Sequence, residues 1–159
     1  MEKFNESFFC SFREASSHRS KDGKIRIIKS TDGEKWDSVF LQGYSNCDLR
    51  DPNLSITPFG DLMLNAVINY WEDGNKLKRQ SVTWLSSDGE MWDGPYYCPT
   101  GVNTWRWKVA WNDTLGYSVA YTEDGKLVKN TEQVKKGDTL VTKLSKGKIN
   151  SLIKKIQNE

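Results

Sequence analysis

The chain has 159 residues, of which 36% are hydrophobic, 12% aromatic and 28% charged, and its formal net charge is +2. This length and aromatic content are sufficient for a compact domain with a buried core, and they exclude an intrinsically disordered chain. A mean hydropathy of -0.69, without an apolar run of about 20 residues, excludes a helical membrane protein, so we expect no membrane partner.

The N-terminal segment and the cysteines bear on location and cofactors. MEKFNESFFCSF contains neither a basic leader nor a long apolar run, so we expect no signal peptide and a cytoplasmic location. Cys10, Cys47 and Cys98 are odd in number and far apart, which argues against a disulfide framework or a CxxC metal site. We therefore expect reduced thiols in the core, no metal ion and no cofactor.

Strand-like runs begin near the N-terminus. They are FFCSFRE at residues 8–14, KIRIIKS at 24–30 and DSVFLQ at 37–42. Each is rich in β-branched or aromatic residues, and turn-forming residues separate them, which indicates antiparallel strands. FFCSFRE stands where an interior strand is expected, so this first unit is predicted to start without its opening strand.

One nine-residue pattern occurs twice, as STDGEKWDS at residues 30–38 and as SSDGEMWDG at residues 86–94. In each copy the Asp carboxylate and the Ser hydroxyl can accept hydrogen bonds from backbone N–H groups of a turn. The Gly takes the positive φ that such a turn requires, and the Trp re-enters the sheet. We predict two equivalent structural hairpin turns, formed by Ser30, Asp32, Gly33 and Trp36 and by Ser86, Asp88, Gly89 and Trp92.

The residues between the two copies form a second unit. Its strand-like runs are LRDPNLSITP, LMLNAVINYW, RQSVTWLSS and PYYC, with turns at Phe59-Gly60-Asp61 and Asp73-Gly74. Four successive antiparallel strands with a period near 50 residues are typical of one propeller blade. WRWKVAW and GYSVAYT are expected to open a third unit.

The two turn patterns resemble the Asp box of sialidase-like (BNR) β-propellers, with one residue missing between Asp and Gly. FFCSFREASS followed by GKIRIIKSTDGEKW is similar to the first blade of that family, and DLRDPNLSITPFGDLMLN to the next. The resemblance covers about residues 7–121. It implies a mostly β protein with a partial propeller of about two and a half antiparallel blades, followed by a C-terminal segment of short strands.

The same resemblance implies a site for a sugar acid. Exo-sialidases hold the substrate carboxylate with three arginines, because planar guanidinium groups bind carboxylates bidentately. The candidates for such ligand binding are Arg13, Arg50 and Arg106. The alternative is ion pairing on the surface or between blades, which Arg50 favours because it lies between Asp48 and Asp51.

A complete catalytic set is not identifiable. The family's acid/base Asp precedes the first Asp box, where this chain has Asp22, although Asp-Gly between strands also predicts an ordinary turn. Glu14 and His18 are further candidates for proton transfer, with a solvated loop as the alternative. The family's Tyr nucleophile and its Glu partner belong to later blades, so Tyr44, Tyr70 and Tyr117 are expected to be core or rim aromatics.

The composition changes near residue 115, which predicts one part over 1–114 and another over 115–159. All seven Trp precede Asn112, and 115–159 contains nine Lys, no Arg and five acidic residues. Residues 116–157 resemble the C-terminal segment of the exonuclease VII large subunit. The resemblance is carried by Gly116, Tyr117, Ser118, Asp124, Gly125, Gln133, Val134, Gly137, Asp138, Leu144 and Gly147.

The chemistry expected of the C-terminal segment is limited. In that family catalysis belongs to an upstream domain, so the segment brings no nuclease site. Its excess of lysines could attract phosphates, but it lacks an aromatic stacking platform, and a solvated basic face is the alternative. LVTKL alternates as a strand does, whereas Ile149, Leu152, Ile153 and Ile156 also fit a helical period, so both structures stay open for 148–157.

Three functions follow from these observations. The first is a sialidase-like module that binds a glycan or is a remnant glycoside hydrolase, and the second is a nucleic-acid-associated protein. The third is a structural chimera or a self-assembling propeller fragment without a ligand. The GYSVAY string suits both families and is where the two parts, of natural or constructed origin, would join. A partial propeller leaves strand edges unpaired, so we also expect a homo-oligomer.

Overall fold

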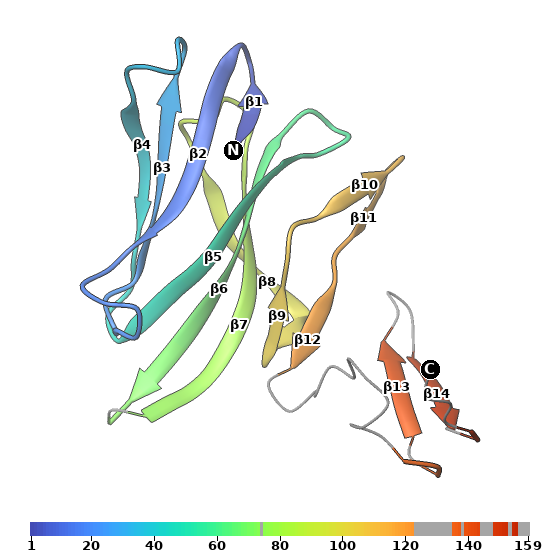
Figure 1. The fold of residues 1–159 in the computed structure, drawn as a ribbon. Helices are drawn as coiled ribbons and strands as arrows, with labels where there is room; N and C mark the ends of the chain where they lie inside the picture. The colour runs from blue at the N-terminus through green and yellow to red at the C-terminus, as the bar shows by residue number, and fades with distance from the viewer. Residues whose placement is uncertain (74, 123–134, 138, 144–147, 153, 156–159) are drawn as a thin grey trace. The chain divides into compact units, whose positions relative to one another are not determined.

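The structure, a computed structural model, describes residues 1–73, 75–122, 135–137, 139–143, 148–152 and 154–155 (Figure 1). Every regular element in this part of the chain is a β-strand, and the pairings are antiparallel. No helix in these ranges is long and apolar enough to cross a membrane. The chain divides into two compact units, Met1–Glu123 and Asp124–Glu159.

The first four strands of the first unit form a meander, here called sheet A. They are β1 (Glu2–Phe4), β2 (Ser7–Glu14), β3 (Lys24–Ser30) and β4 (Asp37–Gln42), in that order across the sheet. The expectation that this unit lacks its opening strand is wrong, because Glu2–Phe4 pairs with Ser7–Phe9. The intervening turn uses positive φ angles at Asn5 and Glu6 and contains no glycine, which hid it in the sequence.

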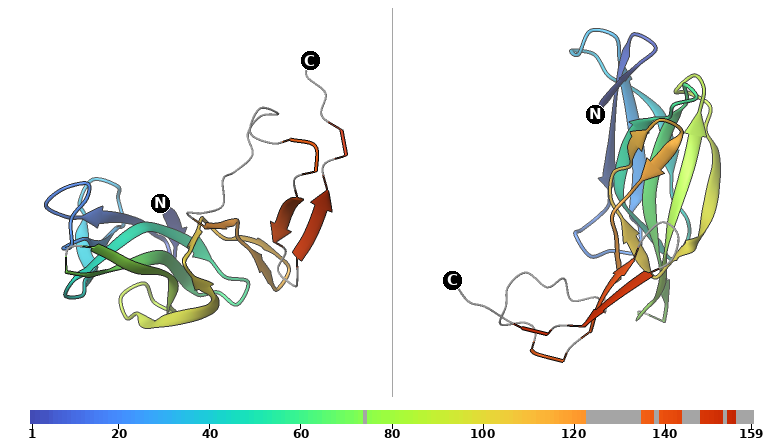
Figure 2. Two further views of the ribbon diagram at one scale, coloured as in Figure 1. Left: turned by 90° about the horizontal axis from the view of Figure 1, so that it is seen from below. Right: turned by 90° about the vertical axis from the view of Figure 1, so that its right-hand side faces the viewer.

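The next four strands form a second meander, sheet B. They are β5 (Cys47–Ile56), β6 (Leu62–Glu72), β7 (Asn75–Ser86) and β8 (Asp93–Val102), again in sequence order across the sheet. The prediction of four successive antiparallel strands here is confirmed. Sheets A and B thus have the same strand order. In Figures 1 and 2 the strands of sheet A are blue to cyan, and those of sheet B are green to yellow.

Sheets A and B share one hydrophobic core. Phe9, Ile25 and Ile27 from sheet A and Leu64 and Trp84 from sheet B are almost fully buried in it. On β6 the alternate residues Met63 and Val67, on the other face of sheet B, are buried as well. Because neighbouring residues of a strand point to opposite faces, this pattern means that sheet B is covered on both sides.

Four short strands follow sheet B, and the first of them contacts β6, β7 and β8. They are β9 (Thr104–Arg106), β10 (Ala110–Asn112), β11 (Leu115–Tyr117) and β12 (Ala120–Thr122); β9 pairs with β12 and β10 with β11. The Oγ of Ser81 on β7 donates to the backbone carbonyl of Thr104 at 2.9 Å. Together these two pairs form one long hairpin, here called the β9–β12 hairpin. The boundary expected between 114 and 115 falls between its strands β10 and β11, whereas the compact units divide after residue 123.

The two Ser-x-Asp-Gly turns connect the third and fourth strands of their sheets and have the same hydrogen bonds. Ser30 Oγ accepts from the Gly33 N–H at 2.8 Å, and Ser86 Oγ accepts from the Gly89 N–H at 2.8 Å. Asp32 Oδ1 accepts from two following N–H groups at 2.8 and 2.9 Å, as Asp88 Oδ1 does at 2.8 Å. These backbone donors hold the pKa of both carboxyls below the usual range.

The turns differ in their surroundings. A methyl group added at Gly33 would meet nothing within 4 Å, whereas one at Gly89 would lie 2.3 Å from the Phe9 ring of sheet A. Next to Gly89, Glu90 pairs with Lys29 of sheet A at 2.7 Å. The second turn therefore packs against the neighbouring sheet, and the first is open to solvent.

The second unit contains an antiparallel hairpin of β13 (Thr139–Lys143) and β14 (Lys148–Leu152). Before it, Lys136 and Gly137 form a turn, with a φ of 96° at Gly137. The strand alternative is therefore confirmed over Lys148–Leu152, and the helical one is wrong there. Ile153 and Ile156, which the helical alternative includes, lie outside the described residues.

Candidate functional site

Arg13 and Arg50 meet at one buried carboxylate. Arg13 Nε lies 2.8 Å from Asp48 Oδ1, and Arg50 Nε lies 2.6 Å from Asp48 Oδ2. The Asp48 side chain is only 1% exposed, while the arginine side chains are 19% and 17% exposed. Both carboxylate oxygens are therefore used within the protein, and the pair links β2 of sheet A to β5 of sheet B.

Further donors of these two arginines also bind the protein. Arg13 donates to the Ser17 carbonyl and to Ser20 Oγ, each at 3.0 Å, and Arg50 donates to the His18 carbonyl. The structure thus brings two of the three predicted arginines together, but as an ion-paired cluster between sheets. Arg106 is not among their partners and lines a separate cavity.

The candidates for proton transfer make structural contacts. Asp22 accepts from the Ser16 N–H at 3.2 Å, and hydrogen bonds from Ser20 and Ser16 lower its pKa. Glu14 pairs with Arg26 at 2.6 Å, and the hydrogen bond from Arg26 lowers its pKa. A general acid at neutral pH needs a raised pKa, so neither carboxyl suits that role. His18 is exposed and contributes its carbonyl to Arg50.

The tyrosines do not supply an activated nucleophile. Burial raises the pKa of Tyr44 and of Tyr70, and a hydrogen bond with Tyr97 raises the pKa of Tyr70 further. Tyr117 is 49% exposed on β11. A phenolate nucleophile requires a lowered pKa, so Tyr44 and Tyr70 do not suit that role.

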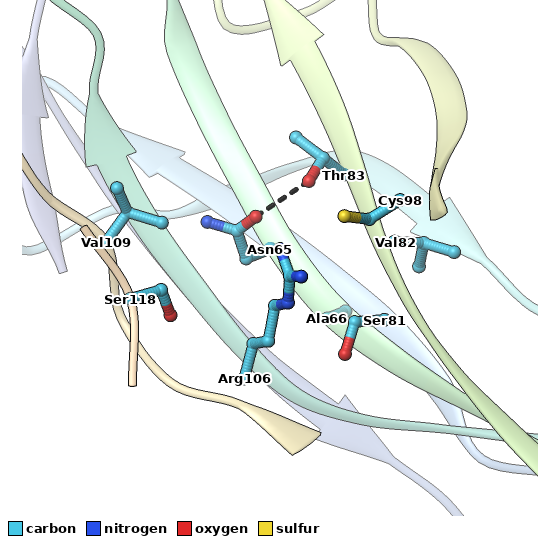
Figure 3. Close-up of a pocket in the computed structure, with 9 residues that line it drawn as sticks. All are labelled: Asn65, Ala66, Ser81, Val82, Thr83, Cys98, Arg106, Val109 and Ser118. Carbon is cyan, nitrogen blue, oxygen red and sulfur yellow. Dashed lines mark hydrogen bonds between the residues drawn. The ribbon is translucent and has the colours of Figure 1, made fainter. Parts of the chain in front are cut away.

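A small cavity lies next to Arg106 on the second face of sheet B (Figure 3). Its volume is about 40 Å³. The residues that line it come from β6, β7 and β8 of sheet B and from the β9–β12 hairpin: Asn65, Ala66, Ser81, Val82, Thr83, Cys98, Arg106, Val109 and Ser118. Figure 3 shows the guanidinium of Arg106 extended towards Asn65 and Thr83.

The polar groups of this cavity are only partly paired. Thr83 Oγ1 donates to Asn65 Oδ1 at 2.7 Å, and Arg106 Nη2 donates to Thr100 Oγ1 at 2.5 Å. Asn65 Nδ2 and Arg106 Nε are buried and have no hydrogen-bond partner among the residues described. Two donors therefore remain for an acceptor that enters the cavity.

Cys98 lines the same cavity, with its Sγ 3.4 Å from Thr100 Oγ1. Burial acts to raise its pKa, but the hydrogen bonds with Thr100 and the positive charge of Arg106 outweigh burial, so the thiol pKa is lowered. Cys47, by contrast, is buried in the core, and burial raises its pKa. Cys98 is thus the more acidic of these two thiols.

Sequence reasoning missed Asn65, Cys98 and Ser118. Asn65 gave one visible signal, because it is a polar residue within the apolar run LMLNAVINYW. Cys98 and Ser118 gave none, since their meeting with Arg106 depends on the register of four strands. Among the described residues, no group of three or more His, Cys, Asp and Glu side chains could hold a metal ion.

In the second unit, the described surface side chains are basic. Lys135, Lys136, Lys154 and Lys155 are all exposed. The segment 115–159 as a whole contains nine Lys and five acidic residues. This excess of positive charge suits a polyanionic partner.

Comparison with known proteins gives a local similarity to two exodeoxyribonuclease 7 large subunits. The exodeoxyribonuclease 7 large subunit of Photorhabdus laumondii subsp. laumondii is 52% identical over 44 residues, which are 28% of this chain and 10% of that protein. The same subunit of Vibrio parahaemolyticus serotype O3:K6 is 50% identical over 38 residues, 24% of this chain and 9% of that protein. The chain therefore spans about a tenth of the length of these curated relatives.

The other comparisons found no match. No family model matches the chain, and no solved structure matches it. The resemblance to sialidase-like propellers receives no support from these comparisons.

Proposed function

We propose that the chain is a DNA-associated protein that contacts nucleic acid through its C-terminal segment, about residues 116–157. The observation that carries this proposal is the identity of about one half with the exodeoxyribonuclease 7 large subunit over 38 to 44 residues. The name of that protein describes an enzyme that acts on DNA. A segment in which about half of the residues are identical supports a shared interaction with DNA.

The charge of the segment supports the same proposal. Over residues 115–159 the lysines exceed the acidic residues by four, as nine against five. Lys136, Lys154 and Lys155 are exposed and available for phosphate contacts. Contacts of this kind release condensed counterions, so binding of this type weakens as the salt concentration rises.

We propose binding and not cleavage. The resemblance of residues 116–157 to the exonuclease VII large subunit places the catalytic domain of that family upstream of the shared segment. In the first unit, Glu14 and Asp22 are held as paired carboxylates with lowered pKa values, which does not favour a hydrolytic role. Sugar-acid binding by Arg13, Arg50 and Arg106 is not proposed, because Asp48 already occupies two of these arginines.

For the first unit we propose the finer architecture of an incomplete sialidase-like propeller. Two features support it: sheets A and B have the same strand order, and equivalent Ser-x-Asp-Gly turns occupy the same corner of each sheet. The β9–β12 hairpin corresponds to the start of a further blade. This unit would then serve as a scaffold that carries the DNA-binding segment.

Fluorescence anisotropy of a labelled single-stranded oligonucleotide, titrated with the full chain, tests the function. We expect binding at low salt that weakens between about 50 and 200 mM salt. Reversal of Lys136, Lys154 and Lys155 to Glu should lower the affinity and make the slope of log K against log salt shallower by about 2, at ~0.7 per lost phosphate contact.

A matched variant controls for net charge. It reverses three exposed lysines of the first unit, Lys21, Lys24 and Lys35, and should keep most of the affinity and the slope. Equal losses in both variants would show attraction by overall charge only. The absence of binding at the lowest salt would overturn the proposal.

A further inference from the structure

The cavity beside Arg106 contains an uncompensated positive charge. Arg106 is partly buried, and its hydrogen-bond partners are the hydroxyl of Thr100 and the thiol of Cys98. None of the nine residues that line the cavity carries a carboxylate. Within the described residues no ion pair includes Arg106, whereas Arg13, Arg26 and Arg50 each have a carboxylate partner.

A second donor lies in the same cavity with its orientation fixed. Thr83 Oγ1 donates to Asn65 Oδ1 at 2.7 Å, so the amide nitrogen of Asn65 is turned away from Thr83. That Nδ2 group is buried and has no partner in the part of the chain described. Arg106 Nε–H and Asn65 Nδ2–H are therefore two donors in one cavity that both lack an acceptor, and each suits a negatively charged atom.

The other polar groups of the cavity are already engaged. Ser81 Oγ donates to the Thr104 carbonyl at 2.9 Å, and Ser118 Oγ donates to the Trp107 carbonyl at 2.8 Å. Neither side chain brings a negative charge, and neither hydroxyl oxygen accepts a hydrogen bond from Asn65 Nδ2 or Arg106 Nε. An acceptor for these two donors therefore comes from outside this set of residues.

We propose that this cavity binds a small monovalent anion of the size of chloride or formate, held by Arg106 Nε and Asn65 Nδ2. The volume of about 40 Å³ sets the size of the ligand. A water molecule needs roughly 10–15 Å³ measured in this way, so the space admits an ion of a few atoms and is small for a phosphate or sulfate. An anion also neutralises the buried guanidinium, which a water molecule cannot do.

The anion has a consequence for Cys98, which lines the same cavity. The positive charge of Arg106 stabilises the thiolate of Cys98, and a bound anion would screen that charge. Anion occupancy is therefore expected to slow alkylation of Cys98, which gives a second readout on the unaltered protein.

The test is a heteronuclear NMR titration of the full chain with sodium formate and sodium chloride, observing arginine Nε–H and asparagine side-chain NH₂ resonances. We expect the Arg106 and Asn65 resonances to shift together and to saturate. The Arg19 resonance, from an exposed loop, serves as the internal reference and should show no saturable shift. Sodium sulfate should produce no saturable shift of Arg106.

Two variants sharpen the test. N65D replaces the amide by a carboxylate of the same shape, which pairs with Arg106 and competes with the ion from within the protein, so formate binding should fall at least tenfold. The matched control, R19Q, should bind as the parent chain does. If N65D does not fold, the titration of the unaltered chain still tests whether the anion binds at Arg106 and Asn65.

Three outcomes would overturn the proposal. The first is an Arg106 resonance that does not move with either anion, which would leave water as the occupant. The second is a shift that persists unchanged in N65D. The third is sulfate binding as strong as that of formate, which would contradict the size and charge assigned to the site.

Discussion

The buried carboxylate of Asp48 fixes the side chains of two neighbouring arginines by ion pairing. Its two oxygens hold Arg13 and Arg50, and Gly23 leaves the space for this, since a Cβ there would lie 1.9 Å from Asp48 Oδ1. The Leu49 N–H also donates to the Gly23 carbonyl at 3.0 Å. The arginines thus join the two sheets. Removing one member of such a buried pair costs about 3–5 kcal/mol.

Cys98 and Arg106 give a prediction at the same scale. The cation at Arg106 lowers the pKa of Cys98, so at a fixed neutral pH a larger fraction of the thiol is ionised. Replacing Arg106 by Gln removes that charge, raises the pKa and slows alkylation at neutral pH. The difference in alkylation rate between the parent chain and the variant should disappear at a pH well above the pKa of Cys98, where Cys98 is a thiolate in both proteins.

Site-resolved mass spectrometry after iodoacetamide treatment measures this effect at each cysteine. Cys98 should react faster than Cys47, whose burial raises its pKa and blocks access. R19Q is the control for a lost arginine and should leave the rate at Cys98 unchanged. A pH profile of Cys98 that is the same with and without Arg106 would refute the coupling.

At the scale of elements, alternation and turn chemistry made most strands predictable. KIRIIKS and LMLNAVINYW became β3 and β6, because their apolar residues alternate or run continuously towards a core. The strand Glu2–Phe4 was missed since its turn depends on Asn5 and Glu6 at positive φ, which no residue pattern announced. The hairpin at Thr139–Leu152 was predicted as a set of strands, with a helix left open at its end.

The site was less predictable than the strands. Arg13 meets Asp48, and Arg106 meets Asn65, only because strands from different parts of the chain stack or pair in a particular register. The sequence shows which residues are arginines, but it does not show how far apart they lie in the folded protein. A predicted cluster of three arginines therefore became a salt-bridged pair and a separate cavity.

The twin turns offer a matched pair of substitutions. Gly33 and Gly89 have nearly the same φ, 81° and 80°, but only Gly89 faces the Phe9 ring. G33A should lower the free energy of unfolding by about 1–2 kcal/mol, the cost of a left-handed conformation. G89A should cost about 1–3 kcal/mol more, because the added methyl overpacks the core between the sheets.

Urea unfolding followed by tryptophan fluorescence would measure both losses. Their difference isolates the contact with Phe9, since the backbone cost is common to the two variants. Equal losses would mean that the second turn does not pack against sheet A as the structure shows.

At the scale of the whole molecule, unpaired strand edges predict self-association. In the sheets as described, β4 and β8 form edges, and Leu41 on β4 is 46% exposed. Edge strands with exposed apolar residues pair with other chains, and a charged residue at such an edge prevents this. We therefore expect oligomers whose population rises with protein concentration and falls when Leu41 is replaced by Lys.

Sedimentation velocity over a wide range of protein concentration checks this expectation. Phe59, which is 74% exposed in the β5–β6 loop, is the control position, and F59K should associate as the parent chain does. A parent chain that stays monomeric at high concentration, or a loss of association in F59K alone, would rule out pairing through the β4 edge.

Association with DNA through the C-terminal segment is the central claim, and amide NMR spectra of the full chain titrated with single-stranded DNA test it most directly. We predict that the perturbed amides belong to residues 116–157, including Lys136 and Lys154, while those of residues 1–115 keep their positions. Perturbations confined to residues 1–115, or none at low salt, would contradict it.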